Sequence, residues 1–349
     1  MSIIPKSFKA AVLVETQKPL VLQQIKTPML ATGKILVKME FSGLCHSQLM
    51  EVKGGRGEDK FLPHLLGHEG VGEVVAIGKG VSKVAIGQRV VLGWLKGEGL
   101  ESGGQTYLNE SNTTINSGPV TTFSDYTVVS ENRVVLCPKG LPSNVAVLLG
   151  CALPTGAGII LNQLQPKPNS SVVIFGLGGI GLSALLALNH FNVKQVIAFD
   201  VEEHKLALAK ELGATHTYLA NEVGLVNFFS NFPDGVDYAV EAAGKNHTIE
   251  MAFSLIKRGG GKCIFASHPK NGDKIQLDPF ELICGKQIQG SWGGASKPDQ
   301  DIPIIVDIIN KYQIPVEKLL SNEYSLEQIN TALDDLAARK IIRALIKLN

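Results

Sequence analysis

The segment SVVIFGLGGIGLSALL, residues 171–186, joins a short apolar run, a glycine-rich turn and the start of an apolar helix. Gly176, Gly178 and Gly181 in this segment follow the GxGxxG spacing. The first glycine permits a tight turn, the second lets a pyrophosphate approach the backbone, and the third lets helix and strand pack closely. The helix that follows offers free N–H groups and a positive dipole end to phosphates. The segment therefore predicts a βαβ unit that binds a dinucleotide.

The chain beyond this turn continues to alternate strands and helices. Apolar runs at residues 194–200, 236–244 and 261–267 predict strands, and EEHKLALAKELG at 202–213 predicts a helix. Such alternation is typical of a parallel sheet. Asp200 ends the second strand, about 20 residues beyond the last glycine, where a carboxylate accepts hydrogen bonds from a ribose 2′-hydroxyl. Because that carboxylate would repel a 2′-phosphate, the sequence favours NAD over NADP.

The first part of the chain has a different pattern. Short apolar runs separated by glycines, at residues 9–15, 33–43, 70–78 and 87–94, predict the strands of a β-rich domain. The stretch 93–119 is rich in Gly, Ser, Asn and Thr, and we expect it to form an exposed loop or lobe.

The last part of the chain predicts an amphipathic helix at 325–340 and a strand at 341–348. We expect it to fold back on the first domain. The predicted fold is therefore α/β. A β-rich domain spans 1–153 and is completed by 293–349, and a doubly wound Rossmann sheet spans 154–292.

Composition limits the classes of function. A chain of 349 residues fits two domains, and a net charge of +1 gives no general attraction to nucleic acid or to a membrane surface. No apolar run approaches the roughly 18 residues of a membrane span, and the N-terminus lacks the apolar run of a signal peptide. The five cysteines are odd in number and widely spaced, which favours free thiols in a reducing compartment. We expect a soluble, cytoplasmic protein.

Three residues of the first part are candidate metal ligands: Cys45 in GLCHSQ, His68 in GHEGVG and Cys151 in GCALPT. Each alone also fits an inert core position. Together, two thiolates and an imidazole match a catalytic zinc with one open position. Sequence spacing leaves open whether they converge.

With these motifs in place, the chain resembles the zinc-containing alcohol dehydrogenases of the medium-chain dehydrogenase/reductase superfamily. The stretch GHEGVGEVVAIGKGV at 67–81 resembles their zinc signature, and the likeness extends through GLGGIG at 176–181 to the terminal IIRALIKL. The resemblance implies a GroES-like catalytic domain beside the Rossmann domain. It also implies hydride transfer between a small alcohol or carbonyl compound and NAD.

The resemblance assigns the catalytic residues. Cys45, His68 and Cys151 would hold the catalytic zinc, and Glu69 would lie beside it as a supporting group or transient ligand. Ser47 would bond the substrate oxygen and pass its proton onward.

The resemblance also assigns the cofactor and substrate residues. Trp94 would form an aromatic wall of the substrate pocket, although Trp94 and Ile180 also fit ordinary core packing. His46 and Arg343 would lie at the pyrophosphate, Lys205 at the adenosine ribose, and Thr155 and Ile180 against the nicotinamide, in addition to Gly176, Gly178, Gly179, Gly181 and Asp200.

Three departures from the family pattern matter. Residues 93–118 contain no cysteine, so we predict one catalytic zinc per chain and no structural zinc. Met50 occupies the position of a proton-relay histidine and cannot carry a proton. Gln48 replaces an acidic residue beside Ser47, which gives the ligand shell less negative charge.

Other functions stay open at this point. The hydroxyl compound could be a polyol or sugar derivative, although Cys151 favours the alcohol dehydrogenase branch. A zinc-free NADPH-dependent quinone or enoyl reductase would need neither the three ligands nor Asp200, and a catalytically idle binding protein is a further alternative. By resemblance we expect a homodimer formed at a sheet edge near residues 285–296, with a tetramer as the alternative.

Overall fold

The computed structural model describes residues 4–348, which divide into two compact units. The first unit comprises residues 1–151, 297–300 and 317–349, and the second comprises 152–296 and 301–316. Our expected division placed all of 293–349 with the first domain, whereas residues 293–296 and 301–316 group with the second unit. The α/β fold class, with a β-rich domain and a parallel Rossmann sheet, is confirmed.

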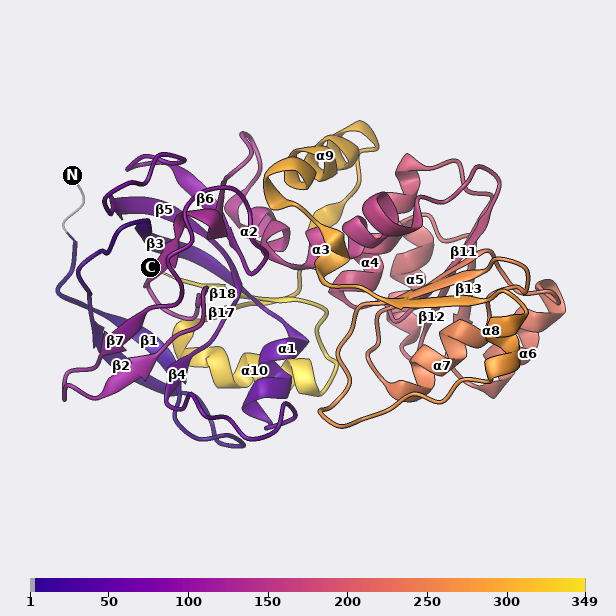
Figure 1. The fold of residues 1–349 in the computed structure, drawn as a ribbon, viewed down its shortest axis with the longest axis horizontal. Coiled ribbons are helices and arrows are strands. Elements are labelled where there is room, and N and C mark those ends of the chain that lie inside the picture. The colour runs from indigo at the N-terminus through magenta and orange to yellow at the C-terminus, as the bar shows by residue number, and fades with distance from the viewer. Residues whose placement is uncertain (1–3, 349) are drawn as a thin grey trace. The chain divides into compact units, whose positions relative to one another are not determined.

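The first unit contains two sheets (Figure 1). The five-stranded sheet has the order β2 (Val21–Lys26), β1 (Ser7–Leu13), β4 (His64–Leu65), β8 (Thr114–Asn116) and β7 (Thr106–Leu108). The other sheet has the order β10 (Val134–Leu136), β6 (Arg89–Gly93), β5 (Glu69–Ile77), β3 (Lys34–Leu44), β18 (Ala344–Lys347) and β17 (Glu323–Ser325), with β9 (Tyr126–Ser130) also paired to β3. Its helices are α1 (His46–Val52), α2 (Ser143–Ala146) and α10 (Ile329–Ala337).

Strand β3 connects the two apolar cores of this unit. Successive side chains of a strand point to opposite faces. Ile35, Val37 and Met39 accordingly pack in the larger cluster, which includes residues of α10, while Leu36 packs in the other. The C-terminal strand β18 pairs antiparallel with β3, so the end of the chain completes the sheet of the first unit.

The polar stretch 93–119, which we expected to form an exposed loop or lobe, contains two short antiparallel strands, β7 and β8. The central residues of these strands, Tyr107 and Ile115, are buried, whereas most of their neighbours are exposed. Three-residue strands with one buried residue each are too short to show a periodic pattern in the sequence. The stretch therefore extends the five-stranded sheet.

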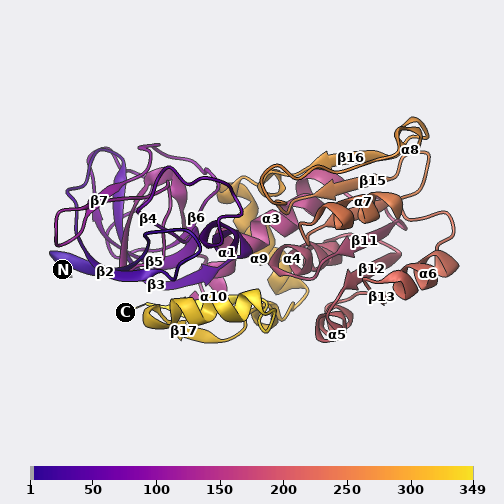
Figure 2. The ribbon, with the colours of Figure 1, turned by 90° about the horizontal axis from the view of Figure 1, so that it is seen from below.

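The second unit is a six-stranded parallel sheet with the order β13 (His216–Leu219), β12 (Gln195–Asp200), β11 (Ser171–Phe175), β14 (Tyr238–Glu241), β15 (Lys262–Phe265) and β16 (Gln287–Gly290). Helices α4 (Gly179–Ala187), α5 (Glu203–Glu211), α6 (Glu222–Asn231) and α7 (Asn246–Ser254) each contact the strand before them (Figure 2). The other helices are α3 (Ala152–Gly158), α8 (Pro279–Ile283) and α9 (Pro298–Lys311).

Helix α9 explains why residues 301–316 belong to the second unit. Ile305, Ile308 and Ile309 line a small apolar space together with Leu153 and Leu186. These isoleucines recur at helical spacing, so burying this face stabilises the helix against α3 and α4.

The described residues include no single helix that is long and apolar enough to cross a membrane. One pair of helices with a sharp bend between them, Ser143–Gly150 and Ala152–Leu164, is together long and apolar enough, judged by length and composition only.

Candidate metal centre

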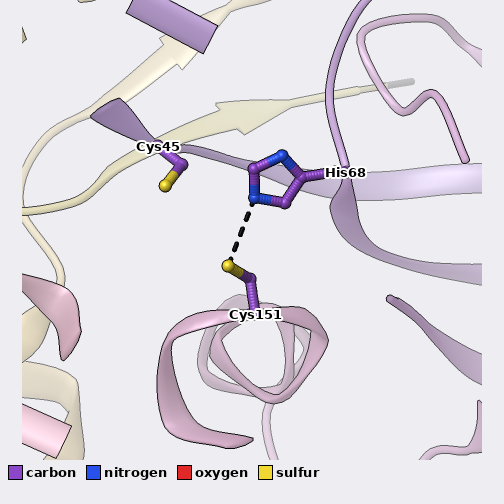
Figure 3. Close-up of side chains that lie close together, drawn as sticks. All are labelled: Cys45, His68 and Cys151. Carbon is purple, nitrogen blue, oxygen red and sulfur yellow. Dashed lines mark hydrogen bonds between the residues drawn. The ribbon is translucent and has the colours of Figure 1, made fainter. Parts of the chain in front are cut away.

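Cys45, His68 and Cys151 lie together in the first unit. Their ligand atoms are all within 4.8 Å of one another, and His68 Nε2 lies 3.2 Å from Cys151 Sγ. Figure 3 shows the three side chains directed toward a common point. Residue spacing left their convergence open, and the structure brings all three together.

Strand pairing explains why these distant residues meet. Cys45 follows β3 directly, and His68 directly precedes β5, which pairs with β3. Cys151 reaches the same point because Gly150 packs tightly on β5 and β6: a Cβ at Gly150 would lie 2.3 Å from Leu92 O. Any side chain at position 150 would therefore push Cys151 away from the other two ligands.

The two thiols interact through a side-chain hydrogen bond. The hydrogen bond with Cys151 is the main cause that lowers the pKa of Cys45 well below the ordinary thiol value, with help from Arg343. The same bond, together with burial, raises the pKa of Cys151. A lowered thiol pKa favours the thiolate, which is the form of cysteine that binds a metal.

Arg343 and Glu69 form a buried ion pair beside the ligands. The guanidinium Nη2 lies 3.0 Å from Glu69 Oε2, and both side chains are almost fully buried. Burial alone would lower the pKa of Arg343, but Glu69, Cys45 and Cys151 raise it, so the guanidinium keeps its charge. The structure thus places Arg343 against Glu69 and the thiols, and its predicted contact with a pyrophosphate stays a prediction.

The other ring nitrogen of His68 contacts two residues of α1. Its Nδ1 is hydrogen-bonded to the amide nitrogen of Gln48 and lies 3.4 Å from Ser47 Oγ. Gln48 Oε1 in turn accepts the backbone N–H of Cys45 at 3.0 Å. One amide therefore contacts two of the three candidate ligands, a relationship that the sequence did not reveal.

These residues fit a metal ion. The ligand atoms of a tetrahedral zinc lie at about 2.0 Å (N) and about 2.3 Å (S), which places an N–S pair roughly 3.5 Å apart, close to the distance between His68 and Cys151. Two sulfur ligands and one imidazole, with one position open, are the donor set of a catalytic zinc.

A second group of candidate ligands, Glu51, Asp59 and His64, was missed in the sequence because its members have no motif spacing. His64 Nε2 lies 2.8 Å from Asp59 Oδ2, and Arg56 lies 4.0 Å from Glu51. Basic groups of the chain already face both carboxylates, so we assign no metal to this group.

The predicted dinucleotide turn lies in the second unit. Gly176 has φ +91°, and a Cβ at Gly181 would lie 1.8 Å from Gly176 O, so both positions require glycine. Gly178 precedes α4, whose first residues are Gly179 and Ile180. The turn has the close backbone packing that GxGxxG predicts.

Asp200 lies at the end of β12 and holds this turn. Its Oδ2 accepts the N–H of Leu177 at 2.6 Å, and its Oδ1 accepts the N–H of Glu202 at 3.0 Å. A carboxylate oxygen can accept a second hydrogen bond, so a ribose hydroxyl could still bind.

The remaining residues that we predicted to contact cofactor or substrate lie on several different elements. Lys205 is buried on α5, and Thr155 is buried on α3 with a hydroxyl that has no hydrogen-bond partner among the described residues. His46 is exposed at the start of α1, and Trp94 is half-buried after β6. Their predicted contacts with cofactor or substrate stay predictions.

Charged side chains form hydrogen bonds with the backbone of the polar lobe at residues 93–118. Glu131 is almost fully buried and accepts backbone N–H groups from residues 82–83 and from Leu100 at 2.6–2.8 Å. Lys34 donates to the carbonyl of Gly103 at 2.5 Å. Carboxylate and ammonium groups therefore organise this cysteine-free lobe.

Comparisons with known proteins agree with this architecture. Residues 31–139 match the sequence model of the alcohol dehydrogenase GroES-like domain, and residues 179–311 match that of zinc-binding dehydrogenases. An alcohol dehydrogenase class-3 from Cereibacter sphaeroides is 28% identical, covering 97% of this chain and 99% of the relative. An alcohol dehydrogenase class-P from Arabidopsis thaliana is also 28% identical, over 97% of this chain and 96% of the relative.

Solved structures show the same likeness. The crystal structure of benzyl alcohol dehydrogenase from Acinetobacter calcoaceticus has a TM-score of 0.88 at 29% identity, covering 99% of this chain and all of the other. An alcohol dehydrogenase zinc-binding domain protein from Burkholderia ambifaria has a TM-score of 0.90 at 29% identity, covering 98% and 99%. The chain is thus an alcohol oxidoreductase, and it belongs to the zinc-type alcohol dehydrogenase family of the medium-chain dehydrogenase/reductase superfamily.

Proposed function

We propose that this chain transfers a hydride between a primary or secondary alcohol and NAD, with one zinc ion held by Cys45, His68 and Cys151. The observation that carries the proposal is the convergence of these three ligand atoms within 4.8 Å. A zinc ion held there supplies Lewis-acid chemistry, which polarises an alcohol or carbonyl oxygen.

The chain's own residues would handle the proton. Oxidation of an alcohol gives a hydride to NAD⁺ and releases the hydroxyl proton. We propose that Ser47, whose Oγ lies 3.4 Å from Nδ1 of the ligand His68, accepts that proton first. Met50 cannot continue the path, so we propose that the proton then passes through hydroxyls and water. The ion pair of Glu69 with Arg343 places a positive charge beside the two thiols and would balance the charge of their thiolates.

We propose NAD rather than NADP because Asp200 places a negative charge at the end of β12. A 2′-phosphate there would be repelled, whereas a 2′-hydroxyl would be bound. The buried, unpartnered hydroxyl of Thr155 supports a ligand contact at that residue. Absence of cysteine from residues 93–118 supports a single catalytic zinc and no structural zinc.

We also propose a homodimer formed at β16. This strand is one edge of the parallel sheet, and large apolar side chains near it are exposed, including Ile283 at 79% and Trp292 at 78%. Edge strands with exposed apolar neighbours readily pair with another chain. Light scattering should give twice the monomer mass, and Ile288→Pro in the strand should reduce it to the monomer mass.

The substrate class is tested by an NADH-coupled screen of aliphatic, aromatic, polyol and sugar-derived alcohols with the zinc-loaded protein. We expect turnover of simple aliphatic or aromatic alcohols with NAD⁺ and little with NADP⁺. Selective turnover of polyols would reassign the substrate. Quinone or enoyl reduction with NADPH by a zinc-free protein would contradict the proposal.

A further inference from the structure

We infer that Gln48 weakens the hold of the three ligands on their metal, because its amide cannot satisfy two ligand residues at the same time. The inference rests on the proposed zinc site. Gln48 is 2% exposed and is the third residue of α1. Its oxygen accepts the backbone N–H of Cys45, and its amide nitrogen contacts Nδ1 of His68.

The conflict follows from the two nitrogens of His68. Nε2 faces Cys151 Sγ at 3.2 Å and is therefore the nitrogen directed at the metal position. A ring nitrogen that binds a metal carries no proton, so the proton of the neutral ring must reside on Nδ1. Nδ1–H then needs an acceptor, but it faces the NH₂ group of Gln48, which is also a donor.

Turning the amide around does not remove the conflict. The amide oxygen would then accept from His68 Nδ1–H, but the NH₂ group would face the backbone N–H of Cys45. An amide has one acceptor end and one donor end, whereas both neighbours are donors once His68 binds a metal. Ser47 Oγ can accept from Nδ1 only over 3.4 Å, which is a long contact.

A carboxylate at position 48 would resolve the conflict, because both of its oxygens accept. Partners of a ligand histidine change metal affinity by roughly 10- to 100-fold. Gln48 therefore acts as a positioning residue that makes the metal exchangeable, and Gln48→Glu should hold it more tightly.

The test is the rate at which zinc leaves the full-length, zinc-loaded protein for an excess of a coloured chelator at neutral pH. Gln48→Glu should release zinc about 10-fold more slowly than the wild type, or slower still. Met50→Glu adds the same charge two residues along α1 without replacing the Gln48 amide and is the matched control. It should release zinc at the wild-type rate.

A second readout is the rise in thermal midpoint on adding zinc, which should be larger for Gln48→Glu than for the wild type. If Gln48→Glu does not fold without zinc, Gln48→Asp supplies the same acceptors on a shorter side chain. Equal release rates for wild type and Gln48→Glu would overturn the inference, as would equal slowing by Met50→Glu. A wild-type chain that binds no zinc would instead contradict the proposed function, and this inference with it.

Discussion

Arg343 and Glu69, which are 274 residues apart in the chain, form a 3.0 Å ion pair buried beside the candidate metal ligands. Removing one partner of a buried pair leaves an uncompensated charge. Arg343→Met should therefore lower the free energy of unfolding of the metal-free protein by about 3–5 kcal/mol. Urea denaturation measures this loss.

A matched control is Arg89→Met, which breaks the half-exposed pair with Glu40 and should cost about 0–1 kcal/mol. The double variant Arg343→Met/Glu69→Gln should recover part of the lost stability. The double variant should not recover zinc affinity, because it still lacks the Arg343 guanidinium, which favours the Cys45 thiolate. If Arg343→Met and Arg89→Met lower the free energy of unfolding equally, the buried ion pair stabilises the fold no more than the half-exposed pair does.

Glu131 should make the stability of the lobe at residues 93–118 depend on pH. Burial alone would raise its pKa, but three backbone hydrogen bonds outweigh burial and lower it. A carboxylate with a lowered pKa stabilises the fold above about 4.3, its value in an unfolded chain. That contribution is lost as the pH falls through the folded-state pKa.

Glu131→Gln should accordingly lower the free energy of unfolding at neutral pH by about 2–4 kcal/mol, since an amide cannot accept at both ends. Its stability should fall less steeply than that of the wild type between neutral and acid pH, as thermal melts will show. Glu110→Gln, an exposed change in the same lobe, should behave as the wild type. Parallel pH curves for Glu131→Gln and wild type would refute this role.

Asp200→Asn should weaken NAD binding by about 10- to 100-fold, the loss expected for a charge-assisted hydrogen bond. The amide removes the charge and cannot accept from both Leu177 and Glu202. The preference for NAD over NADP should also shrink, and fluorescence titration of NADH and NADPH measures both. Asp237→Asn, which removes a carboxylate ahead of β14, should leave both affinities unchanged.

Ser47→Ala should reduce kcat by about 10²- to 10⁴-fold, the usual contribution of a positioned proton carrier. Zinc content should not change, because Ser47 contacts His68 but contributes no ligand atom to the cluster. Steady-state kinetics together with metal analysis separate the two effects. A variant that loses zinc in proportion to activity would assign Ser47 a structural role instead.

The sequence predicted most of the second unit because local signals were strong there. The apolar run, the glycine turn and Asp200 lie close together in the chain, and each of them is required in the fold for a single steric or electrostatic cause. The short strands β16 and β13 have weaker patterns, since the residues of β16 are mostly exposed and those of β13 are only partly buried.

The metal centre was predictable only in part. The types of ligand pointed to zinc, but their meeting depends on the pairing of β3 with β5 and on the close packing of Gly150. The contact between Gln48 and His68 depends on a side-chain orientation that no residue spacing specifies. Likewise, the buried pairing of Glu69 with Arg343 requires β18 to pair with β3, and the sequence predicted only that the end of the chain folds back on the first domain.

The central claim is that Cys45, His68 and Cys151 hold one zinc ion, and zinc content per chain measures it most directly. Emission spectrometry of the wild type and of Cys137→Ser, which changes a thiol outside the cluster, should give about one zinc per chain. Cys45→Ser should give close to none and should lose alcohol oxidation with it. Zinc near zero in the wild type, or unchanged in an intact, folded Cys45→Ser, would contradict the account.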